Sequence, residues 1–392
     1  MNKRTLLLFT WLALLLCLSC TSTFKLKKIG AEDTRSWKSF RGDARNTGFV
    51  STITPVPDKL LWKYDMNRSV KSSPIIVGGM VVIGSLDKRL NFIDAASGGE
   101  LGYFKVYSSV STSACGDEET IYFGWYNVKE CLFALNLGKK QVRWKASIGD
   151  ISASPILWGD RIFVGTGDGS MWALEKTTGR KIWQFKSQNS VLSTPACLEN
   201  FTTGEGDSLS LNTNEEMVYF GSTDGFLYAL QAKSGKLNWK FKTEGGIYSS
   251  PAIHDGMIFF GSVDGYLYAL NLKDGALAWK FRTGEDIYSS PAVTESLVYI
   301  GSNDYCMYAV NQKTGDLSWK FKTEGLVHSS PIAIGDALFF GSYDGNFYEL
   351  NRFTGELLWK YQTKGMISSS PAYYDGMIYI GSEDGYLYCF GR

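Results

Sequence analysis

The side chains best suited to nucleophilic, redox or metal chemistry are few in this chain and form none of the common motifs. The 392 residues include two histidines and seven cysteines. Beyond the N-terminal segment that holds Cys17 and Cys20, the sequence has no CxxC motif, adjacent cysteine pair, HExxH motif, Gly-rich phosphate loop or Ser-His-Asp set. The recurring Gly-Ser-x-Asp-Gly segments read as turns rather than as nucleophile elbows. We therefore predict no catalytic residue and no metal site.

Chemically diverse side chains occupy one position of an internal repeat, three residues before its marker position. In chain order they are Lys71, Ser111, Ser152, Leu192, Tyr248, Tyr288, His328 and Ser368. The residue before each of them is Val or Ile, as a packed inner strand requires. Variation beside such a fixed position indicates exposed surface, and a ring of it around an axis forms a concave site.

We predict that four of these residues and two nearby turn residues form a binding mouth, because they offer charge, aromatic faces and a titratable donor. They are Lys71, Tyr248, Tyr288, His328, Tyr343 and Glu383. The alternative is that they are merely tolerated exposed residues. His254 falls at the opposite end of its strand from His328 in the repeat alignment, so a two-histidine metal site is not expected.

The repeat that positions these side chains has a period of 40 residues. Its clearest marker, Ser-Ser-Pro, ends at Pro251, Pro291, Pro331 and Pro371. The same or closely related triplets end at Pro74, Pro155 and Pro195, and Ala114 takes the place of the proline in one more. Eight units result, and only the step from Pro195 to Pro251, of 56 residues, breaks the spacing, through a polar excess within residues 199–216.

Each unit contains four short runs rich in Ile, Phe, Tyr and Trp, separated by Asp-Gly or Thr-Gly turns. Such runs are typical of antiparallel strands joined by tight hairpins. Four strands per unit and eight units predict an all-β, eight-bladed β-propeller over residues 60–392. The last unit ends after three strands, so we expect residues 60–64 to supply its fourth strand and close the ring.

Tryptophan recurs in the outermost strand of seven units, where it is expected to pack between blades. These docking residues are Trp62, Trp144, Trp183, Trp239, Trp279, Trp319 and Trp359. Gly102 stands at this position in the remaining unit. We therefore expect the softest joint of the ring there.

The N-terminus has the features of an export signal over residues 1–19. Lys3 and Arg4 precede an apolar stretch, residues 6–18, that is too short to span a bilayer. Cys20 resembles the lipid-accepting cysteine of bacterial lipoprotein signals, although Cys17 stands where that pattern prefers Leu. We expect lipidation at Cys20 and a flexible tether over residues 20–36, with simple cleavage as the alternative.

The overall composition suits a packed globular core and names no partner. Hydrophobic residues make up 44% of the chain and the formal net charge is +1, so no nucleic-acid partner is expected. Five cysteines follow the signal, namely Cys115, Cys131, Cys197, Cys306 and Cys389. All five fall on expected strands and are interpreted as small buried hydrophobic residues.

One spacing, Ala-x-x-x-x-x-Gly-x-x-x-Trp, recurs from Ala229 to Trp239, from Ala269 to Trp279 and from Ala309 to Trp319. It resembles the tryptophan-docking repeat of quinoprotein, or PQQ-type, propellers. The resemblance implies fold more strongly than activity, because many proteins with this repeat hold no quinone. Quinoprotein dehydrogenases often carry adjacent cysteines, a carboxylate and calcium ligands, none of which can be mapped here. We expect no cofactor, with pyrroloquinoline quinone and calcium as the alternative.

The segment Trp37-x-x-Phe40-Arg41-Gly42-Asp43 resembles the lead-in of bacterial members of the repeat family. It places a lead-in packed on the propeller at residues 37–59. The architecture also resembles that of BamB-type outer-membrane assembly lipoproteins.

This second resemblance implies a monomeric propeller that is lipid-anchored in the cell envelope and faces the periplasm, with the outer membrane favoured. It implies a scaffold that binds an envelope protein rather than an enzyme. The alternatives are a PQQ-dependent dehydrogenase, a propeller that binds a small ligand or carbohydrate, and a secreted or soluble periplasmic protein.

Overall fold

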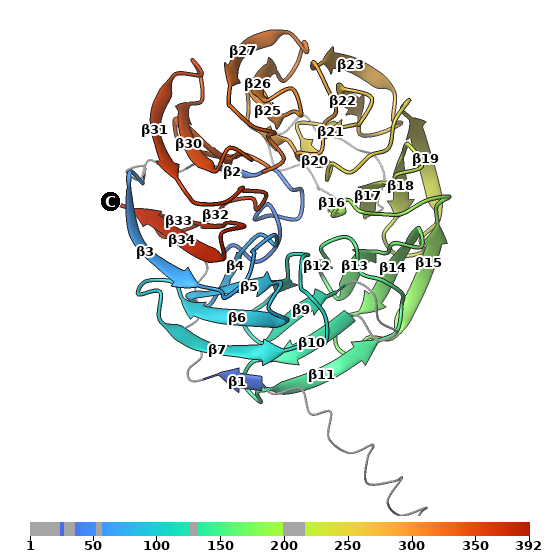
Figure 1. The fold of residues 1–392 in the computed structure, drawn as a ribbon. Helices are drawn as coiled ribbons and strands as arrows, with labels where there is room; N and C mark the ends of the chain where they lie inside the picture. Colours follow the sequence, from blue (N-terminus) through green and yellow to red (C-terminus); the bar gives the residue numbers. More distant parts are fainter. Residues whose placement is uncertain (1–23, 27–35, 52–56, 126–131, 199–215) are drawn as a thin grey trace, which may run out of the picture.

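A computed structural model describes residues 24–26, 36–51, 57–125, 132–198 and 216–392. Four-stranded antiparallel blades follow one another around a central axis and form a ring of eight (Figure 1). The predicted eight-bladed, all-β propeller is therefore confirmed. The signal segment, Cys20, Cys131 and residues 199–215 lie outside the described residues. Within the described ranges, no helix is long and apolar enough to cross a membrane.

The first four blades follow chain order, and each runs from the innermost to the outermost strand. Blade 1 contains β4 (Ile75–Val77), β5 (Met80–Ser85), β6 (Arg89–Asp94) and β7 (Glu100–Lys105). Blade 2 contains β8 (Cys115–Gly116), β9 (Thr120–Gly124), β10 (Leu132–Asn136) and β11 (Gln141–Ala146). Blade 3 contains β12 (Ile156–Trp158), β13 (Arg161–Gly165), β14 (Ser170–Glu175) and β15 (Lys181–Lys186). Blade 4 contains β16 (Ala196–Leu198), β17 (Met217–Gly221), β18 (Phe226–Gln231) and β19 (Leu237–Lys242).

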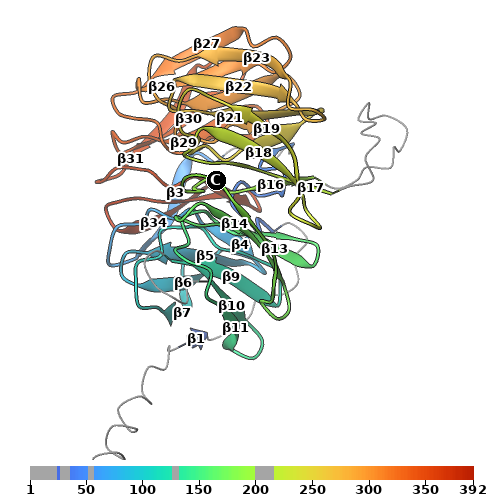
Figure 2. The same ribbon diagram turned by 90° about the vertical axis from the view of Figure 1, so that its right-hand side faces the viewer.

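The last four blades complete the ring, which Figure 2 shows from the side. Blade 5 contains β20 (Ala252–His254), β21 (Met257–Gly261), β22 (Tyr266–Asn271) and β23 (Leu277–Arg282). Blade 6 contains β24 (Ala292–Val293), β25 (Leu297–Gly301), β26 (Cys306–Asn311) and β27 (Leu317–Lys322). Blade 7 contains β28 (Ile332–Ile334), β29 (Ala337–Gly341), β30 (Asn346–Asn351) and β31 (Leu357–Gln362). Blade 8 contains β32 (Ala372–Tyr374), β33 (Met377–Gly381), β34 (Tyr386–Gly391) and β3 (Lys59–Asp65).

The Asp-Gly turns are structural, as the turn between β21 and β22 illustrates. Gly265 adopts a φ of 81°, in the left-handed region that favours glycine. The Asp264 carboxylate accepts hydrogen bonds from the Tyr266 amide at 3.1 Å and from the Tyr268 hydroxyl at 2.8 Å. The same Asp–Tyr pair recurs in blades 4, 6, 7 and 8. These carboxylates therefore hold the turns between the second and third strands.

Tryptophan side chains lock five consecutive joints of the ring. The indole Nε1 of Trp144, Trp183, Trp239, Trp279 and Trp319 donates to a backbone carbonyl of the next blade at 2.9–3.3 Å. Each indole also covers the glycine of that blade's third hairpin; a Cβ at Gly275, for example, would lie 2.6 Å from the Trp239 ring. The lock therefore depends on both the tryptophan and the glycine.

The ring closes through an N-terminal strand, as predicted. β3 pairs antiparallel with β34, and Tyr64 lies opposite Leu387. The two joints beside this blade lack the indole hydrogen bond. Trp359 packs against Phe390 with ring centroids 5.4 Å apart, and the Trp62 Nε1 has no partner among the described residues. The Ala95 carbonyl of blade 1 corresponds to the carbonyls that accept the other indoles, but it accepts a hydrogen bond from the Tyr379 hydroxyl at 3.0 Å instead.

The joint between blades 1 and 2 is braced by a strand that the sequence did not predict. β1 (Phe24–Leu26) adds a fifth strand to blade 1, antiparallel to β7, with Leu26 opposite Gly102. A Cβ at Gly102 would lie 1.8 Å from the Lys25 carbonyl oxygen, so the absent tryptophan leaves room for this strand. Within the expected tether of residues 20–36, residues 24–26 thus form a strand, because β7 offers them an open edge.

Residues 37–50, here named the plug, run around one end of the central channel. Trp37 and Ile76 of blade 1 exchange two backbone hydrogen bonds, in each of which the amide of one residue donates to the carbonyl of the other. The Lys38 carbonyl accepts a hydrogen bond from the Gly116 amide of blade 2. Further along, carbonyls of the plug accept from innermost strands of blades 4, 5, 6 and 7 in turn. β2 (Phe49–Val50) ends this path in parallel pairing with β28. The plug thus ties together blades far apart in the sequence.

Two buried side chains of the plug strengthen this connection. Arg41 is 2% exposed and donates from Nη2 to the Pro291 carbonyl at 3.0 Å. Burial lowers its pKa. Asn46 is fully buried, and its Nδ2 donates to the carbonyls of Pro195 and Pro251 at 3.2 and 3.1 Å.

The cysteines within the described ranges behave as core residues. Cys115, Cys197, Cys306 and Cys389 are buried and form no disulfide. Burial raises the pKa of the Cys389 thiol to about 12. The predicted role as small buried hydrophobic residues is confirmed for these four, which are not placed for thiolate chemistry.

Candidate functional site

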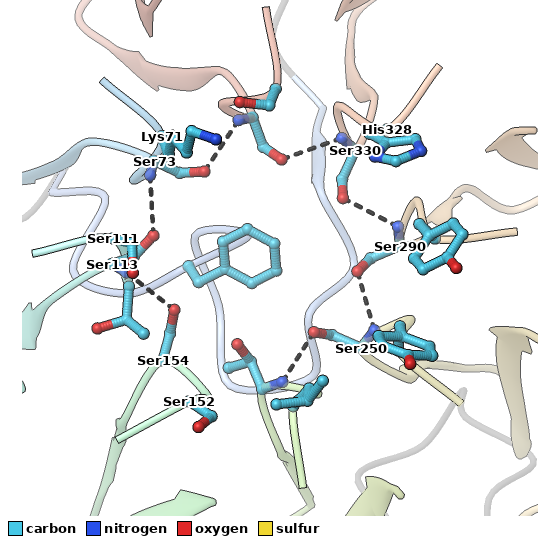
Figure 3. Close-up of a pocket in the computed structure, with 18 residues that line it drawn as sticks. Lys71, Ser73, Ser111, Ser113, Ser152, Ser154, Ser250, Ser290, His328 and Ser330 are labelled. Carbon is cyan, nitrogen blue, oxygen red and sulfur yellow. Dashed lines mark hydrogen bonds between the residues drawn. The ribbon is translucent and has the colours of Figure 1, made fainter. Parts of the chain in front are cut away.

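The central channel opens on one face of the ring as a cavity of about 210 Å³, here named the cup (Figure 3). Its walls are the segments that enter the innermost strand of each blade, so every blade contributes to it. The plug contributes one lining residue, Phe40. Because the plug bonds to the middle residues of several innermost strands, Ile76, Cys197, Ile253 and Ala333 among them, Phe40 closes the cup from within the channel.

A ring of hydroxyl side chains, here named the serine ring, surrounds the cup. Its members are Ser73, Ser113, Ser154, Thr194, Ser250, Ser290, Ser330 and Ser370. At seven of the eight joints the backbone amide of one member donates to the Oγ of the next, at 2.9–3.1 Å (Figure 3). The Ser-Ser-Pro marker therefore joins neighbouring blades around the axis.

Aromatic side chains form a continuous row along one part of the mouth. Ring centroids lie 4.9 Å apart for Tyr248 and Tyr288, 4.9 Å for Tyr288 and His328, and 4.6 Å for His328 and Tyr343. The Tyr288 and His328 rings are stacked at 27°. These four residues, here named the aromatic arc, come from blades 5, 6 and 7 and the segments that enter them.

His328 is held by two hydrogen bonds. Its Nε2 lies 2.7 Å from the Asn303 Oδ1, and its Nδ1 lies 2.9 Å from the Tyr343 hydroxyl. The amide oxygen only accepts, so Nε2 carries the proton and Nδ1 accepts from Tyr343. Burial lowers the pKa of His328, which keeps the ring neutral near neutral pH.

The polar part of the mouth spans the ring closure. The Lys71 ammonium lies 3.5 Å from the Glu383 carboxylate, and the Ser368 hydroxyl donates to that carboxylate at 2.9 Å. Lys71 is half-exposed, whereas the Glu383 side chain is 13% exposed. The lysine charge is thus compensated within the site.

The structure brings the six predicted mouth residues together. Lys71, Tyr248, Tyr288 and His328 line the cup, while Tyr343 and Glu383 support them from turns behind. The serine ring and Phe40 were missed as lining residues. The repeated Ser-Ser-Pro triplet could have indicated the serine ring, because one serine of each copy lines the cup. From the sequence alone, the triplet was used only to define the period of the repeat. The docking tryptophans lie in the outermost strands instead, at the joints between blades.

His254 lies in a different place from His328. It ends β20 opposite Met257, at the hairpin remote from the mouth. Burial lowers its pKa, with nearby Arg45 of the plug acting in the same direction. Neither histidine belongs to a metal-binding group, because no three His, Cys, Asp or Glu side chains in the described ranges are arranged to hold a metal.

Two protein-family models match the repeats. One, described as outer membrane protein assembly factor BamB, matches residues 223–334 and 324–390. The other, described as the β-propeller domain of glucose, ethanol and alcohol dehydrogenases, matches residues 134–257. The chain is a PQQ-like β-propeller.

Individual relatives fall into the same two groups. Quinohemoprotein alcohol dehydrogenase ADH IIB of Pseudomonas putida is 26% identical over 50% of this chain and 24% of its own length. Outer membrane protein assembly factor BamB of Burkholderia pseudomallei is 25% identical over 49% of this chain and 48% of its own. The chain therefore matches about a quarter to a half of these relatives.

A solved structure supports the fold. The crystal structure of BamB from Moraxella catarrhalis superposes with a TM-score of 0.67 at 18% identity, over 86% of this chain and all of that one.

The cup does not fit the quinone cofactor for which the repeat is named. Pyrroloquinoline quinone is planar and carries several carboxylates, which need cationic or metal partners. Lys71 is the sole lining residue with a permanent charge among the described residues, and Glu383 already compensates it. Phe40 and the plug also occupy the channel below. No step through this cofactor is derived for the chain.

Proposed function

We propose that this chain is an exported envelope protein whose propeller is an interaction scaffold that binds its partner through the cup. Lipid attachment at Cys20 would hold it in the membrane, facing the periplasm. The similarity to BamB proteins at the level of family model, sequence and fold supports an envelope role. A place in outer-membrane protein assembly is the more specific form of this proposal.

One observation carries the proposal: the ring has a closed end and an open end. The plug bonds to the innermost strands of six blades and closes the channel on its side. The opposite end remains a concave surface that combines an aromatic arc, hydroxyls and an ion pair. Concave surfaces with convergent polar and aromatic groups are the usual location of binding sites. A rigid ring with one such surface suits a scaffold.

A second candidate is a PQQ-dependent dehydrogenase, which the alcohol dehydrogenase relatives favour. Its discriminating test is incubation of the purified protein with pyrroloquinoline quinone and calcium, followed by a dye-linked alcohol oxidation assay. The compensated charge of the cup predicts no oxidation above the level of protein alone. Turnover that requires both additions would replace the scaffold proposal with the enzyme.

The scaffold proposal is tested by affinity capture from detergent-solubilised envelopes, followed by mass spectrometry. The wild type is compared with a Tyr248→Ala/Tyr288→Ala variant, which removes two rings of the arc. A Leu277→Ala/Phe353→Ala variant is the matched control, since both residues are exposed and lie toward the other end of the blades.

The wild type and the control should enrich the same envelope protein, with a barrel-assembly component expected, whereas the mouth variant should lose at least tenfold of that enrichment. Equal capture by all three proteins would remove the cup from the proposal. Fractionation of a Cys20→Ala variant tests the anchor separately, because release into the soluble fraction is expected and membrane retention would contradict lipidation.

A further inference from the structure

The cup contains hydrogen-bond donors without internal acceptors. In the serine ring, seven Oγ atoms each accept a backbone amide, as described above. The corresponding hydroxyl protons have no acceptor in the described part of the chain. These side chains are mostly buried, Ser250 and Ser290 being 4% exposed and Ser330 3%. Buried hydroxyl donors require an acceptor, and the cup is the space from which one can reach them.

The hydroxyl of Ser152 differs from those of the serine ring, because it packs against Gly167, where a Cβ would lie 3.0 Å from its Oγ. Ser152 occupies the variable position of blade 3 and lines the cup. Its Oγ is buried and has no hydrogen-bond partner among the described residues. The hydroxyl groups that the cup offers to a ligand are therefore those of the serine ring.

The apolar surface of the cup is aromatic and narrow. Tyr248 and Tyr288 line it from one side, and Phe40 closes its inner end. The volume of about 210 Å³ is below the roughly 300–1,000 Å³ of pockets for drug-sized molecules. A fitting ligand is therefore small, with C–H groups for the rings and many oxygens for the hydroxyls.

The charges around the cup indicate whether such a small, oxygen-rich ligand is anionic, cationic or neutral. The ion pair of Lys71 and Glu383 leaves no excess positive charge for a polyanion. A cation would meet Lys71 and inward-facing hydroxyl protons. A neutral molecule rich in hydroxyl and ether oxygens meets neither obstacle.

We propose that the cup binds a single ring of a neutral carbohydrate, with its C–H face on Tyr248 and Tyr288 and its oxygens on the serine ring. The proposal rests on the part of the proposed function that makes the cup a binding site, and it names a ligand class for that site. The ion pair supplies hydrogen bonds at the rim.

The test uses the purified full-length mature protein with four neutral probes: glucose, galactose, mannose and N-acetylglucosamine. Saturation-transfer NMR detects contact with protein, and titration gives the dissociation constant. Citrate, arginine methyl ester and pyrroloquinoline quinone serve as anionic, cationic and planar comparison probes. The variants are Tyr248→Ala/Tyr288→Ala and Ser290→Ala, and Phe353→Ala is the control. A fold check by circular dichroism accompanies each variant.

At least one neutral sugar should bind, and the tyrosine variant should weaken it at least tenfold while Phe353→Ala leaves it unchanged. Should Ser290→Ala fail the fold check, the tyrosine variant alone decides. Absence of sugar binding, tighter binding of citrate or the arginine ester, or sugar binding that survives loss of both tyrosines would overturn the ligand class.

The two proposals fail separately. If the tyrosine variant loses its captured envelope protein but no sugar binds, the scaffold stands and the carbohydrate proposal falls. If sugar binding depends on the tyrosines while capture does not, the carbohydrate proposal stands and the scaffold does not use the cup.

Discussion

Blades 2 to 7 and the blades beside the ring closure are joined by different means. From blade 2 to blade 7, every joint has an indole that donates to the next blade and covers a glycine. Among the described residues, the three joints around blades 8 and 1 lack that bond and use an edge-to-face contact of Trp359 with Phe390, a Tyr379 hydroxyl and the added strand β1. Blade 8 combines strands from both ends of the chain, and blade 1 has Gly102 in place of the tryptophan, so these joints depart from the regular pattern.

The binding mouth also has one part on the regular blades and one part at the ring closure. The aromatic arc belongs to the regular part of the ring, while Lys71, Glu383 and Ser368 span the closure. A binding partner therefore meets a rigid aromatic surface on one side and a polar surface at the closure on the other. This comparison yields four predictions, in order of decreasing effect.

Removal of the closing strand should have the largest effect. Deletion of residues 21–64 takes away β3 and exposes the edge of β34, so no cooperative unfolding transition is expected. Deletion of residues 21–58 removes β1 and the plug but keeps β3, so a destabilised but cooperative transition is expected. Thermal melts followed by circular dichroism compare the two. Similar melting curves would mean that the ring closes without β3.

Tryptophan replacement should distinguish the two kinds of joint. Trp279→Ala removes an indole that packs on Gly315 and donates to Gln312, at a cost on the order of 3 kcal/mol in the free energy of unfolding. Trp62→Ala removes similar packing without a hydrogen bond, so its cost should be smaller by about 1 kcal/mol. Denaturant titration measures both, and an equal or reversed order would contradict the assignment of stronger joints to the regular part.

Glu349 should make the joint between blades 7 and 8 sensitive to pH. It stands where blades 4, 5 and 6 have alanine opposite the tryptophan, and it is 5% exposed. Burial, with the Asp58 charge acting in the same direction and Arg392 opposing it, raises its pKa to about 7.

A raised pKa in the folded state means that the stabilising contribution is complete below the usual Glu value and is lost as pH rises through about 7. Glu349→Ala and Glu349→Gln should therefore raise the free energy of unfolding at pH 8 by up to about 3 kcal/mol relative to their effect at pH 4. Stability of both variants that parallels the wild type across this range would contradict a buried titrating carboxyl at the joint.

Displacement of β1 should have the smallest effect on stability. Gly102→Ala places a Cβ against the Lys25 carbonyl and should release the strand, with a change of about 1 kcal/mol or less. Trypsin should then cleave after Lys25 faster than in the wild type. Gly99→Ala is the control, because its Cβ would meet only the Ser97 hydroxyl, at 3.3 Å. Equal cleavage rates in both variants would show that β1 does not depend on the missing tryptophan.

The repeat made much of the fold predictable. Eight marker positions gave eight blades, and the missing fourth strand of the last unit identified residues 60–64 as its replacement. The mouth residues were identified because Lys71, Tyr248, Tyr288 and His328 vary beside an invariant β-branched residue. Comparison of the units with one another therefore gave information that an isolated unit lacks.

Other features depend on neighbours that the sequence does not reveal. The hydroxyl of Ser250 meets the amide of Thr194 only when two blades stand side by side. The path of the plug and the pairing of β1 follow from edges and openings that exist only in the finished ring. Gly102 was correctly noticed as an exception, but the strand that takes the space could not be deduced from its own short sequence.

The central claim, that partner binding occurs at the open end of the ring, is tested most directly by hydrogen–deuterium exchange with and without the captured envelope protein. Partner addition should slow exchange in the segments that contain Tyr248, Tyr288 and His328, and leave the hairpins at the plugged end unchanged. Protection confined to those hairpins or to the outermost strands, with the mouth segments unaffected, would contradict the claim.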